Sequence, residues 1–132
     1  MEIRKLGVVG CGLMGSGIAE VAARSGFATV VRETSPELLA KGKGRVEKSM
    51  RGAVERGKMP AAERDQALAR IRFTTEMEDL ADCDLVVEAA TENPEAKKQI
   101  FASLDRICRP EAILASNTSS IPIVELAAAT RR

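Results

Sequence analysis

The chain has 132 residues, of which 45% are hydrophobic and 30% are charged, and its formal net charge is +1. This length suits one compact domain with a real core, and the balanced charge argues against both disorder and general polyanion binding. The absence of Trp and Tyr, with only three Phe, leaves few aromatic side chains on which nucleic-acid bases could stack, so we expect no nucleic-acid partner.

Apolar runs and helical periodicities alternate along the first part of the chain. Residues 3–9 end in a β-branched apolar run that stops at glycine, which is typical of a buried parallel strand. Apolar residues then recur at helical spacing over 13–26, and ATVV (28–31) predicts a second strand. Ser35 and Pro36 suit an N-cap and a first helical position, so a further helix is expected to begin there.

This second helix is predicted to be followed by another before the next strand. Its apolar stripe continues until glycine and proline interrupt the sequence at 57–60, while Gly42 and Gly44 weaken it by about 1 kcal/mol each. A further helix is predicted over 61–70. A helical pair therefore joins the second and third strands, where a plain βαβ unit would use one helix.

The remaining elements complete an α/β pattern. Strands are predicted at IRFT (71–74), LVVEA (85–89) and AILAS (112–116), and a helix is predicted over 94–107 with proline at its first position. Because the strands are apolar on both faces, the order β-α-β-αα-β-β-α-β predicts a parallel sheet covered by helices. We expect no internal repeat and a single domain over 1–132.

A glycine-rich turn follows the first strand. Gly10, Gly12 and Gly15 fit G-x-G-x-x-G, in which the glycines provide a tight turn, close approach of the backbone to a pyrophosphate, and close packing of helix on strand. Glu33 ends the second strand, where a carboxylate accepts hydrogen bonds from ribose hydroxyls and repels a 2′-phosphate. The context predicts a doubly wound sheet of the Rossmann type that binds NAD in preference to NADP.

Two neighbours of this motif leave alternatives open. Arg32 stands beside Glu33 and could soften the exclusion of NADP, although adjacent strand residues point to opposite faces, so we expect it to point away. Cys11 could be a reactive thiol near a helix N-terminus, or simply a small residue tolerated at a variable position, which is the interpretation we favour.

Polar residues follow the fourth and fifth strands, at the edge where a ligand would cross this sheet. Glu88 completes the fourth strand, and residues 90–92 lie in the loop where the second ribose of a dinucleotide would pass. Lys97 faces either solvent or the cleft, and by itself it favours solvent. The segment SNTSSIP after the fifth strand is either a hydroxyl-rich part of the site or an N-cap for a helix that begins near Ile123.

Three segments together resemble the NAD-dependent 3-hydroxyacyl-CoA dehydrogenases, especially the bacterial 3-hydroxybutyryl-CoA type: GVVGCGLMGSGIA, VVEAATENPEAKKQIF and ASNTSSIPI. The resemblance covers nearly the whole chain, and ASNTSS is its most specific part. It implies hydride transfer between NAD(H) and C3 of a 3-hydroxyacyl-CoA or 3-ketoacyl-CoA in fatty acid or butanoate metabolism. It also implies a homo-oligomer for the complete enzyme.

The resemblance assigns roles to individual residues. It implies an NAD site formed by Gly10, Gly12, Leu13, Met14, Gly15, Glu33, Ala90, Glu92, Lys97 and Ser119. It places Asn117 and Ser119 near the reacting carbonyl, where they would orient the substrate. The helical pair would bind coenzyme A, with Ser49, Arg56, Lys97 and Ser119 at the contact positions.

Charge supports a polyanion beside the helical pair independently of the resemblance. Residues 34–72 carry ten Lys or Arg and five Asp or Glu, a net charge of +5 in a chain of net charge +1. Such a lobe would attract the phosphates of coenzyme A, with a gain that shrinks as salt rises. The alternative is an amphipathic helical pair with a solvated basic face.

The chain contains no histidine, the residue best suited to remove a hydroxyl proton near neutral pH. In the family that this chain resembles, the histidine follows the SNTSS segment in a motif like HFFNP. We therefore expect an incomplete NAD-binding domain, without the catalytic base or the helical substrate domain, that does not turn over alone. The fifth strand is expected to leave an edge that pairs with another chain or aggregates.

Two other functions remain open at this stage. One is a 3-hydroxyacid dehydrogenase related to 6-phosphogluconate dehydrogenase, against which SNTSS and Glu33 both argue; the other is a stand-alone nucleotide-binding module without turnover. Three widely spaced cysteines argue against a disulfide framework and, without histidine, against a metal site, and they favour a reducing cytoplasm. The N-terminal apolar run is too short for a signal sequence or a membrane span.

Overall fold

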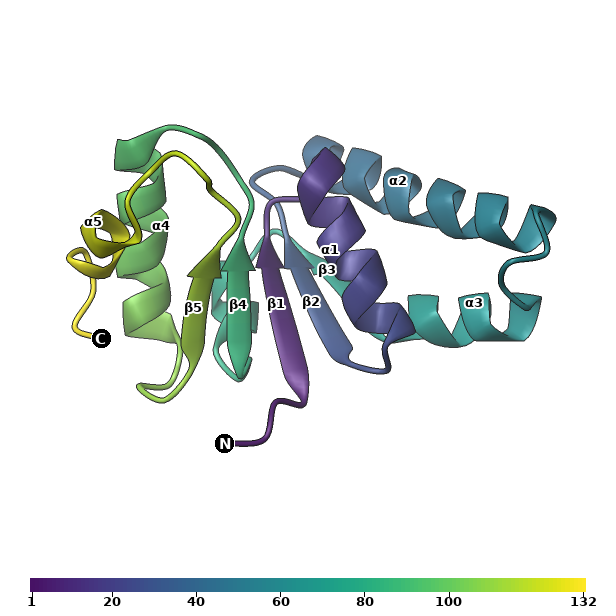
Figure 1. Ribbon diagram of the computed structural model, residues 1–132, viewed down its shortest axis with the longest axis horizontal. Coiled ribbons are helices and arrows are strands. Elements are labelled where there is room, and N and C mark those ends of the chain that lie inside the picture. The colour runs from purple at the N-terminus through teal and green to yellow at the C-terminus, as the bar shows by residue number, and fades with distance from the viewer.

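The computed structural model describes residues 1–132 and has one five-stranded sheet (Figure 1). All four strand pairs are parallel, in the order β3-β2-β1-β4-β5. The strands are β1 (Lys5–Val9), β2 (Ala28–Arg32), β3 (Ile71–Thr74), β4 (Leu85–Glu88) and β5 (Ile113–Ser116). Because they are parallel, their carboxyl ends share one edge of the sheet, where the arrowheads lie in Figure 1.

Five α-helices and one short 3₁₀ helix connect and cover the strands. They are α1 (Leu13–Arg24), α2 (Pro36–Glu55), α3 (Ala61–Ala69), η1 (Met77–Leu80), α4 (Pro94–Ile107) and α5 (Ile123–Ala127). The predicted strands and longer helices are confirmed, with ends shifted by a residue or two, and both helices of the expected pair lie between β2 and β3. The sequence did not predict η1, because a single turn is too short to produce a periodicity.

The central strands bury apolar side chains on both faces of the sheet. Val8 and Val31 pack with α1 on one face, whereas Val9 and Val30 pack with η1 and α4 on the other. This alternation follows from the two-residue period of a strand. The core of a doubly wound fold is therefore split into two layers by the sheet, as the doubly apolar strands predicted.

A third apolar cluster joins the helical pair to α1. Met50 of α2 is fully buried and packs with Ala23 of α1 and Ala67 of α3. α2 begins as predicted, since the Ser35 side chain caps it by accepting a hydrogen bond from the backbone N–H of Leu38 (3.2 Å). The pair is thus packed on the same face as α1 and beside the glycine-rich turn.

The two glycines within α2 differ in role. A Cβ added to Gly42 would lie 2.5 Å from both the Cβ and the Sγ of Cys11, whereas a Cβ added to Gly44 would meet nothing within 4 Å. Gly42 therefore allows α2 to approach the glycine-rich turn closely. The sequence predicted that both glycines simply weaken the helix, and this description fits only Gly44.

β5 is an edge strand, as expected, and Ile113 on it is 47% exposed. An apolar groove of about 330 Å³ lies between β5, α4 and α5, with Phe101, Leu114 and Ile123 among its lining residues. Pairing or aggregation along this edge stays a prediction. No helix combines the length and the apolar character needed to cross a bilayer.

Candidate functional site

The turn between β1 and α1 has a backbone that only glycine accommodates. Gly10 has φ of +99°, and a Cβ there would lie 2.7 Å from both the carbonyl oxygen of Ala89 and the Cα of Ala90. A Cβ on Gly15 would lie 1.9 Å from the carbonyl oxygen of Gly10. These contacts bring the start of α1 onto the ends of β1 and β4, which is the tight turn and close packing that the motif predicts.

The N-terminus of α1 presents hydrogen-bond donors that the protein itself does not use. The backbone N–H groups of residues 12–15 donate to no other group of the protein. A Cβ added to Gly12 would meet nothing within 4 Å, so the surface before these amides is open. Free amides at the positive end of a helix dipole form an anion site, and this geometry fits the pyrophosphate of a dinucleotide.

Glu33 lies beside this turn. Its Oε2 accepts a hydrogen bond from the backbone N–H of Cys11 (2.9 Å) and its Oε1 accepts one from the N–H of Thr34 (2.9 Å). The carboxylate is thus held next to the free amides with further lone pairs available. Arg32 points elsewhere, as expected, since its Nε donates to the carbonyl oxygen of Thr75 (3.1 Å).

Cys11 is a packing residue. Its side chain is fully buried against α2, and burial, reinforced by the charge of Glu33, raises the pKa of the thiol to about 11. A thiol with such a pKa is not a thiolate near neutral pH, so the reactive interpretation of Cys11 is wrong. Arg45 braces the same turn, because its Nη1 donates to the carbonyl oxygen of Cys11 (3.1 Å).

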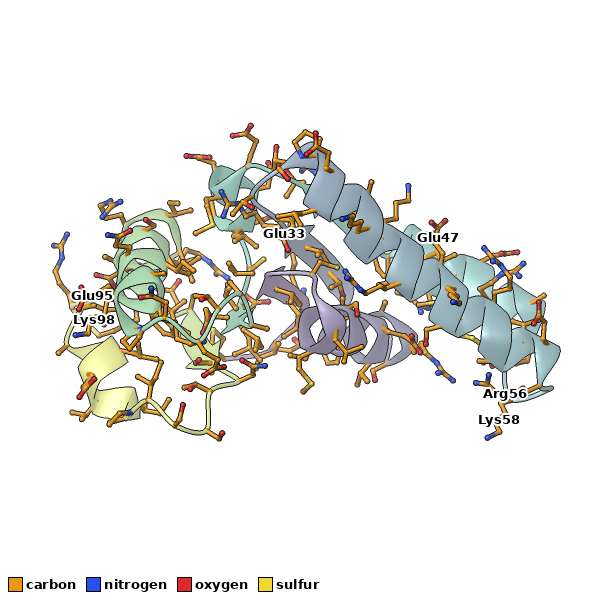
Figure 2. All side chains as sticks on the ribbon, turned by 90° about the horizontal axis from the view of Figure 1, so that it is seen from above. Glu33, Glu47, Arg56, Lys58, Glu95 and Lys98 are labelled. Carbon is orange, nitrogen blue, oxygen red and sulfur yellow. The ribbon has the colours of Figure 1, made fainter.

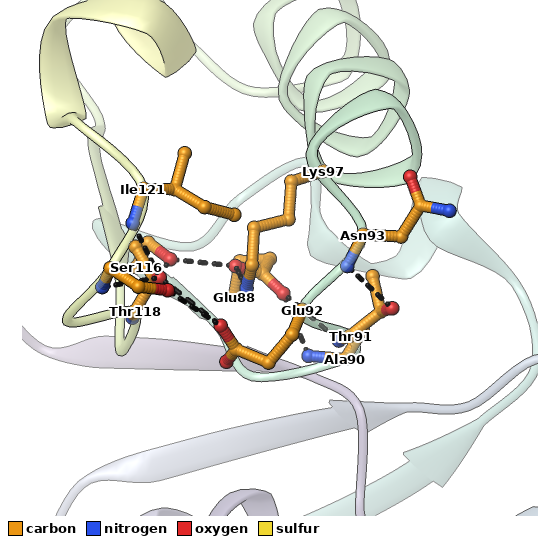
Figure 3. Close-up of polar contacts among 10 residues, drawn as sticks. Glu88, Ala90, Thr91, Glu92, Asn93, Lys97, Ser116, Thr118 and Ile121 are labelled. Carbon is orange, nitrogen blue, oxygen red and sulfur yellow. Dashed lines mark hydrogen bonds and ion pairs between the residues drawn. The ribbon is translucent and has the colours of Figure 1, made fainter.

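The second half of the edge is organised by a buried carboxylate, Glu88 (Figure 3). Its Oε1 accepts hydrogen bonds from Lys97 Nζ (2.6 Å) and from Ser116 Oγ (2.7 Å). Its Oε2 accepts from the backbone N–H groups of Ala90 (2.7 Å) and Thr91 (3.4 Å). Glu88 therefore does more than complete a strand, since it joins the ends of β4 and β5 to α4.

Lys97 faces neither solvent nor an open cleft. The side chains of Lys97 and Glu88 are both 0% exposed, so the expectation that Lys97 favours solvent is wrong. Burial acts to raise the pKa of Glu88, but hydrogen bonds from Lys97, Ser116 and Ala90 outweigh it and hold this pKa below its usual range. These donors thus favour the charged form of the Glu88 carboxyl group despite its burial.

The loops after β4 and β5 meet at a third carboxylate. Glu92 Oε2 accepts hydrogen bonds from the hydroxyls of Thr118 (3.3 Å) and Ser120 (3.4 Å). Ser119 lies exposed between them, and the backbone N–H of Asn117 donates to the carbonyl oxygen of Glu88 (3.0 Å). The structure thus brings the candidate residues of both loops to the edge that carries the glycine-rich turn.

A groove of about 710 Å³ runs between α1 and α2, and its lining includes two of the four residues that the resemblance assigned to coenzyme A, Ser49 and Arg56, but neither Lys97 nor Ser119. Leu13 lies at one end, and Ser49 and Arg56 lie further along α2. Figure 2 shows Arg56 at the opposite end of α2 from Glu33. Its basic lining residues, Arg45, Lys48, Arg51 and Arg56, outnumber the acidic Glu20 and Glu55. No group of His, Cys, Asp and Glu side chains could hold a metal ion.

Comparison with known proteins identifies the family to which this fold and site belong. The model of the NAD binding domain of 3-hydroxyacyl-CoA dehydrogenase matches residues 5–132. The chain belongs to this family. NAD is the coenzyme that this domain family implies, and the match favours the dehydrogenase interpretation over both alternatives.

Relatives and solved structures agree with the family assignment. The chain is 54% identical over 128 residues to a probable 3-hydroxybutyryl-CoA dehydrogenase of Deinococcus radiodurans, covering 97% of this chain and 46% of the relative. It matches the crystal structure of FadB2 from M. tuberculosis with a TM-score of 0.97 and 51% identity, covering 99% of this chain and 46% of that one. The (S)-3-hydroxybutyryl-CoA dehydrogenase PaaH1 of Ralstonia eutropha gives a TM-score of 0.96 at 42% identity, with coverage of 99% and 46%. The chain thus spans about half the length of these relatives.

Three residues of the site escaped the sequence analysis as functional candidates. Glu88 was interpreted as completing a strand, Ser116 was considered only as part of the SNTSSIP segment and had no role of its own, and Arg45 was counted only as one charge of the basic lobe. A charged residue at the end of an otherwise apolar strand was the one available signal for Glu88, because a buried charge requires a partner. Nothing in the sequence indicated that Arg45 would reach the carbonyl group of Cys11.

Proposed function

We propose that this chain binds NAD as the coenzyme-binding part of a dehydrogenase that acts on 3-hydroxyacyl-CoA thioesters. The observation that carries the proposal is the set of free backbone N–H groups at residues 12–15 beside the carboxylate of Glu33. When bound, NAD accepts hydride from the C3 carbon of the substrate. The names of the relatives support 3-hydroxybutyryl-CoA as the substrate class.

The adenosine half of NAD is proposed to lie over β1 and β2. The amides at Gly12 to Gly15 would bind the pyrophosphate, with Leu13 and Met14, which are 83% and 63% exposed, forming the floor beside it. Glu33 would accept hydrogen bonds from the ribose hydroxyls while keeping its contact with the N–H of Cys11. A fixed negative charge there disfavours a 2′-phosphate, so NAD is preferred over NADP.

The other half would lie over the loops after β4 and β5. Ala90 and Glu92 are proposed to flank the nicotinamide ribose, and Ser119 and Asn117 to orient the substrate carbonyl. Lys97 stays a candidate for coenzyme and substrate contact, but its ammonium group would first have to leave Glu88, 2.6 Å away. In the present conformation the only hydrogen bond of the Lys97 side chain is the one to Glu88.

The groove between α1 and α2 is proposed to bind the nucleotide part of coenzyme A. Its basic residues offer several cations to phosphate groups, and Ser49 and Arg56 lie along one wall. The Arg56 guanidinium lies over Gly52, 2.9 Å from the position that a Cβ would take there, so this side chain turns back along α2. Binding in this groove would weaken as salt rises, because exposed charges are screened.

Titration calorimetry of the 132-residue chain with NAD and NADP tests the coenzyme proposal. We expect saturable NAD binding, and we expect Glu33→Gln to lower the preference for NAD over NADP by about tenfold, which corresponds to about 1.4 kcal/mol. Glu47→Gln is the matched control, since this carboxylate lies on α2 and makes no hydrogen bond or ion pair (Figure 2). Absence of NAD binding to the unmodified chain would refute the proposal.

The proposal also includes a base supplied from outside these 132 residues. Oxidation at C3 releases the hydroxyl proton, and neither Ser119 nor the paired Lys97 is suited to accept it near neutral pH. We expect the chain to bind NADH without reducing acetoacetyl-CoA in a spectrophotometric assay. Brisk turnover by this chain would show that the base lies within it.

A further inference from the structure

The Glu88 carboxylate contacts three segments that are distant in sequence. Its four donors come from α4, from β5 and from the loop after β4. An ion pair that only fastened α4 to the sheet would need Lys97 alone. The remaining contacts, those with Ser116 and with the N–H groups of Ala90 and Thr91, instead lead to the two loops at the carboxyl edge (Figure 3).

Ser116 extends the influence of Glu88 into the loop after β5. Its hydroxyl donates to Glu88 Oε1 (2.7 Å), and its oxygen accepts a hydrogen bond from the backbone N–H of Thr118 (3.2 Å). The Thr118 hydroxyl in turn donates a hydrogen bond to Glu92 Oε2 (3.3 Å), which joins the loop after β5 to the loop after β4. A buried carboxylate thus fixes the backbone of Thr118, which directly precedes exposed Ser119, through a single intermediate hydroxyl.

Glu88 also supports the glycine-rich turn. Its Oε2 holds the N–H of Ala90 at 2.7 Å, and Ala90 Cα lies where a Cβ on Gly10 would collide. The loop after β4 is therefore held between Glu88 and the turn. Because the pair with Lys97 is fully buried, solvent does not screen the interactions that maintain this arrangement.

We propose that Glu88, acting through Ser116, is a positioning residue that shapes the nicotinamide side of the coenzyme site. The proposal rests on the proposed function. In the strand order β3-β2-β1-β4-β5, a dinucleotide anchored at β1 and β2 extends toward the ends of β4 and β5. The loops that Glu88 holds are those that would flank the second half of the dinucleotide, whereas Glu33 and the free amides would bind the first.

Comparing two ligands separates a positioning role from a general structural one. ADP contains the adenosine and the pyrophosphate but lacks both the second ribose and nicotinamide, so we would measure its affinity and that of NAD by calorimetry. We expect Ser116→Ala to weaken NAD binding by about threefold to tenfold, as loss of one or two hydrogen bonds would, with a much smaller effect on ADP binding. Ser116→Thr keeps the hydroxyl group and is expected to restore NAD affinity.

Thr29→Val is the matched control for general destabilisation. Thr29 is a buried residue whose hydroxyl, like that of Ser116, donates a hydrogen bond, but it lies at the amino end of β2 and donates to the carbonyl oxygen of Phe27 (3.0 Å), far from the site. We expect it to leave both affinities unchanged. Hydrogen exchange should quicken at Ala90 and Thr118 in Glu88→Gln, and at Thr118 in Ser116→Ala, but at neither residue in Thr29→Val.

The outcomes distinguish the two levels of the proposal. Equal weakening of both ligands by Ser116→Ala, or no weakening of either, would overturn the positioning role while leaving NAD binding intact. Equal affinity of the unmodified chain for NAD and ADP would also overturn it, because the second half of the dinucleotide would then make no net contact. Failure of the unmodified chain to bind either ligand would refute the proposed function itself, and the positioning role with it.

Discussion

The two halves of the carboxyl edge are built by different means. The half at β1 and β2 is formed mostly by backbone. The turn over 10–15 offers free amides, and its shape requires that its glycines have no Cβ atom. The half at β4 and β5 is formed by side chains, with Glu88, Lys97 and Ser116 contributed by three separate elements. The first half is therefore encoded in one short stretch of sequence, whereas the second exists only after the sheet and α4 have assembled.

This difference predicts different responses to substitution. In the backbone-built half, a substitution of a closely packed glycine acts through steric overlap. A glycine two positions further along the same helix, with open space beside it, can be replaced without loss of stability. In the side-chain-built half, a substitution acts through uncompensated charge, and its effect depends on pH. Variants in each half, with matched controls, test whether this distinction holds.

The largest effect is expected for Lys97→Met, which leaves Glu88 as an unpaired buried carboxylate. Breaking a fully buried pair destabilises a protein by about 3–5 kcal/mol, measured here as the free energy of unfolding in urea. Lys98→Met is the control from the next position of α4: Lys98 pairs with exposed Glu95 at 3.5 Å (Figure 2), and such surface pairs are worth about 0–1 kcal/mol. Equal losses of unfolding free energy in Lys97→Met and Lys98→Met would contradict the conclusion that buried side chains build the half of the edge at β4 and β5.

The pH dependence of the same variant gives a second test. In the unmodified chain the pKa of Glu88 is lowered, so its contribution to stability is present above the ordinary carboxyl pKa and is lost as the pH falls through the folded value. Without Lys97, burial should instead raise the pKa of Glu88, so that protonation relieves the penalty. The difference in unfolding free energy between the unmodified chain and Lys97→Met should therefore become smaller as the pH falls from about 7 to about 4.

A smaller but still large effect is expected for Gly15→Ala in the backbone-built half. The added methyl group would lie 1.9 Å from the carbonyl oxygen of Gly10, and such overpacking costs about 1–3 kcal/mol. It should also abolish NAD binding measured by calorimetry, because the turn must shift to accommodate it. Gly17→Ala, two positions along α1 with nothing within 4 Å, should instead gain up to about 1 kcal/mol and keep binding.

The smallest effect is expected where α2 braces the turn. Gly42→Ala places a methyl group 2.5 Å from the Sγ of Cys11, and the gain in helix propensity, about 1 kcal/mol, offsets part of the cost. We expect a net loss of stability together with weaker NAD binding. Gly44→Ala meets nothing within 4 Å and should be stabilising. Urea unfolding that gives the same sign for both variants would show that α2 does not support the turn.

Much of this fold follows from local sequence patterns. The apolar runs at β1 and β4 and the stripe along α2 depend on residues close in the chain, so their periods are visible without the tertiary structure. The same holds for the glycine-rich turn, since Gly10 and Gly15 act within six residues of one another. What failed were predictions for single charged or glycine positions, namely Lys97 and Gly42, whose surroundings come from other elements.

The sequence by itself determined the order of strands and helices, the turn at 10–15 and the family to which these segments belong. Only the tertiary structure decided that Lys97 is buried against Glu88 and that Ser116, 28 positions from Glu88, completes the cluster. The physical reason is that periodicity reports which face of an element is apolar. The partner of a buried charge instead depends on strand order and register, which pair Glu88 with Ser116 across β4 and β5.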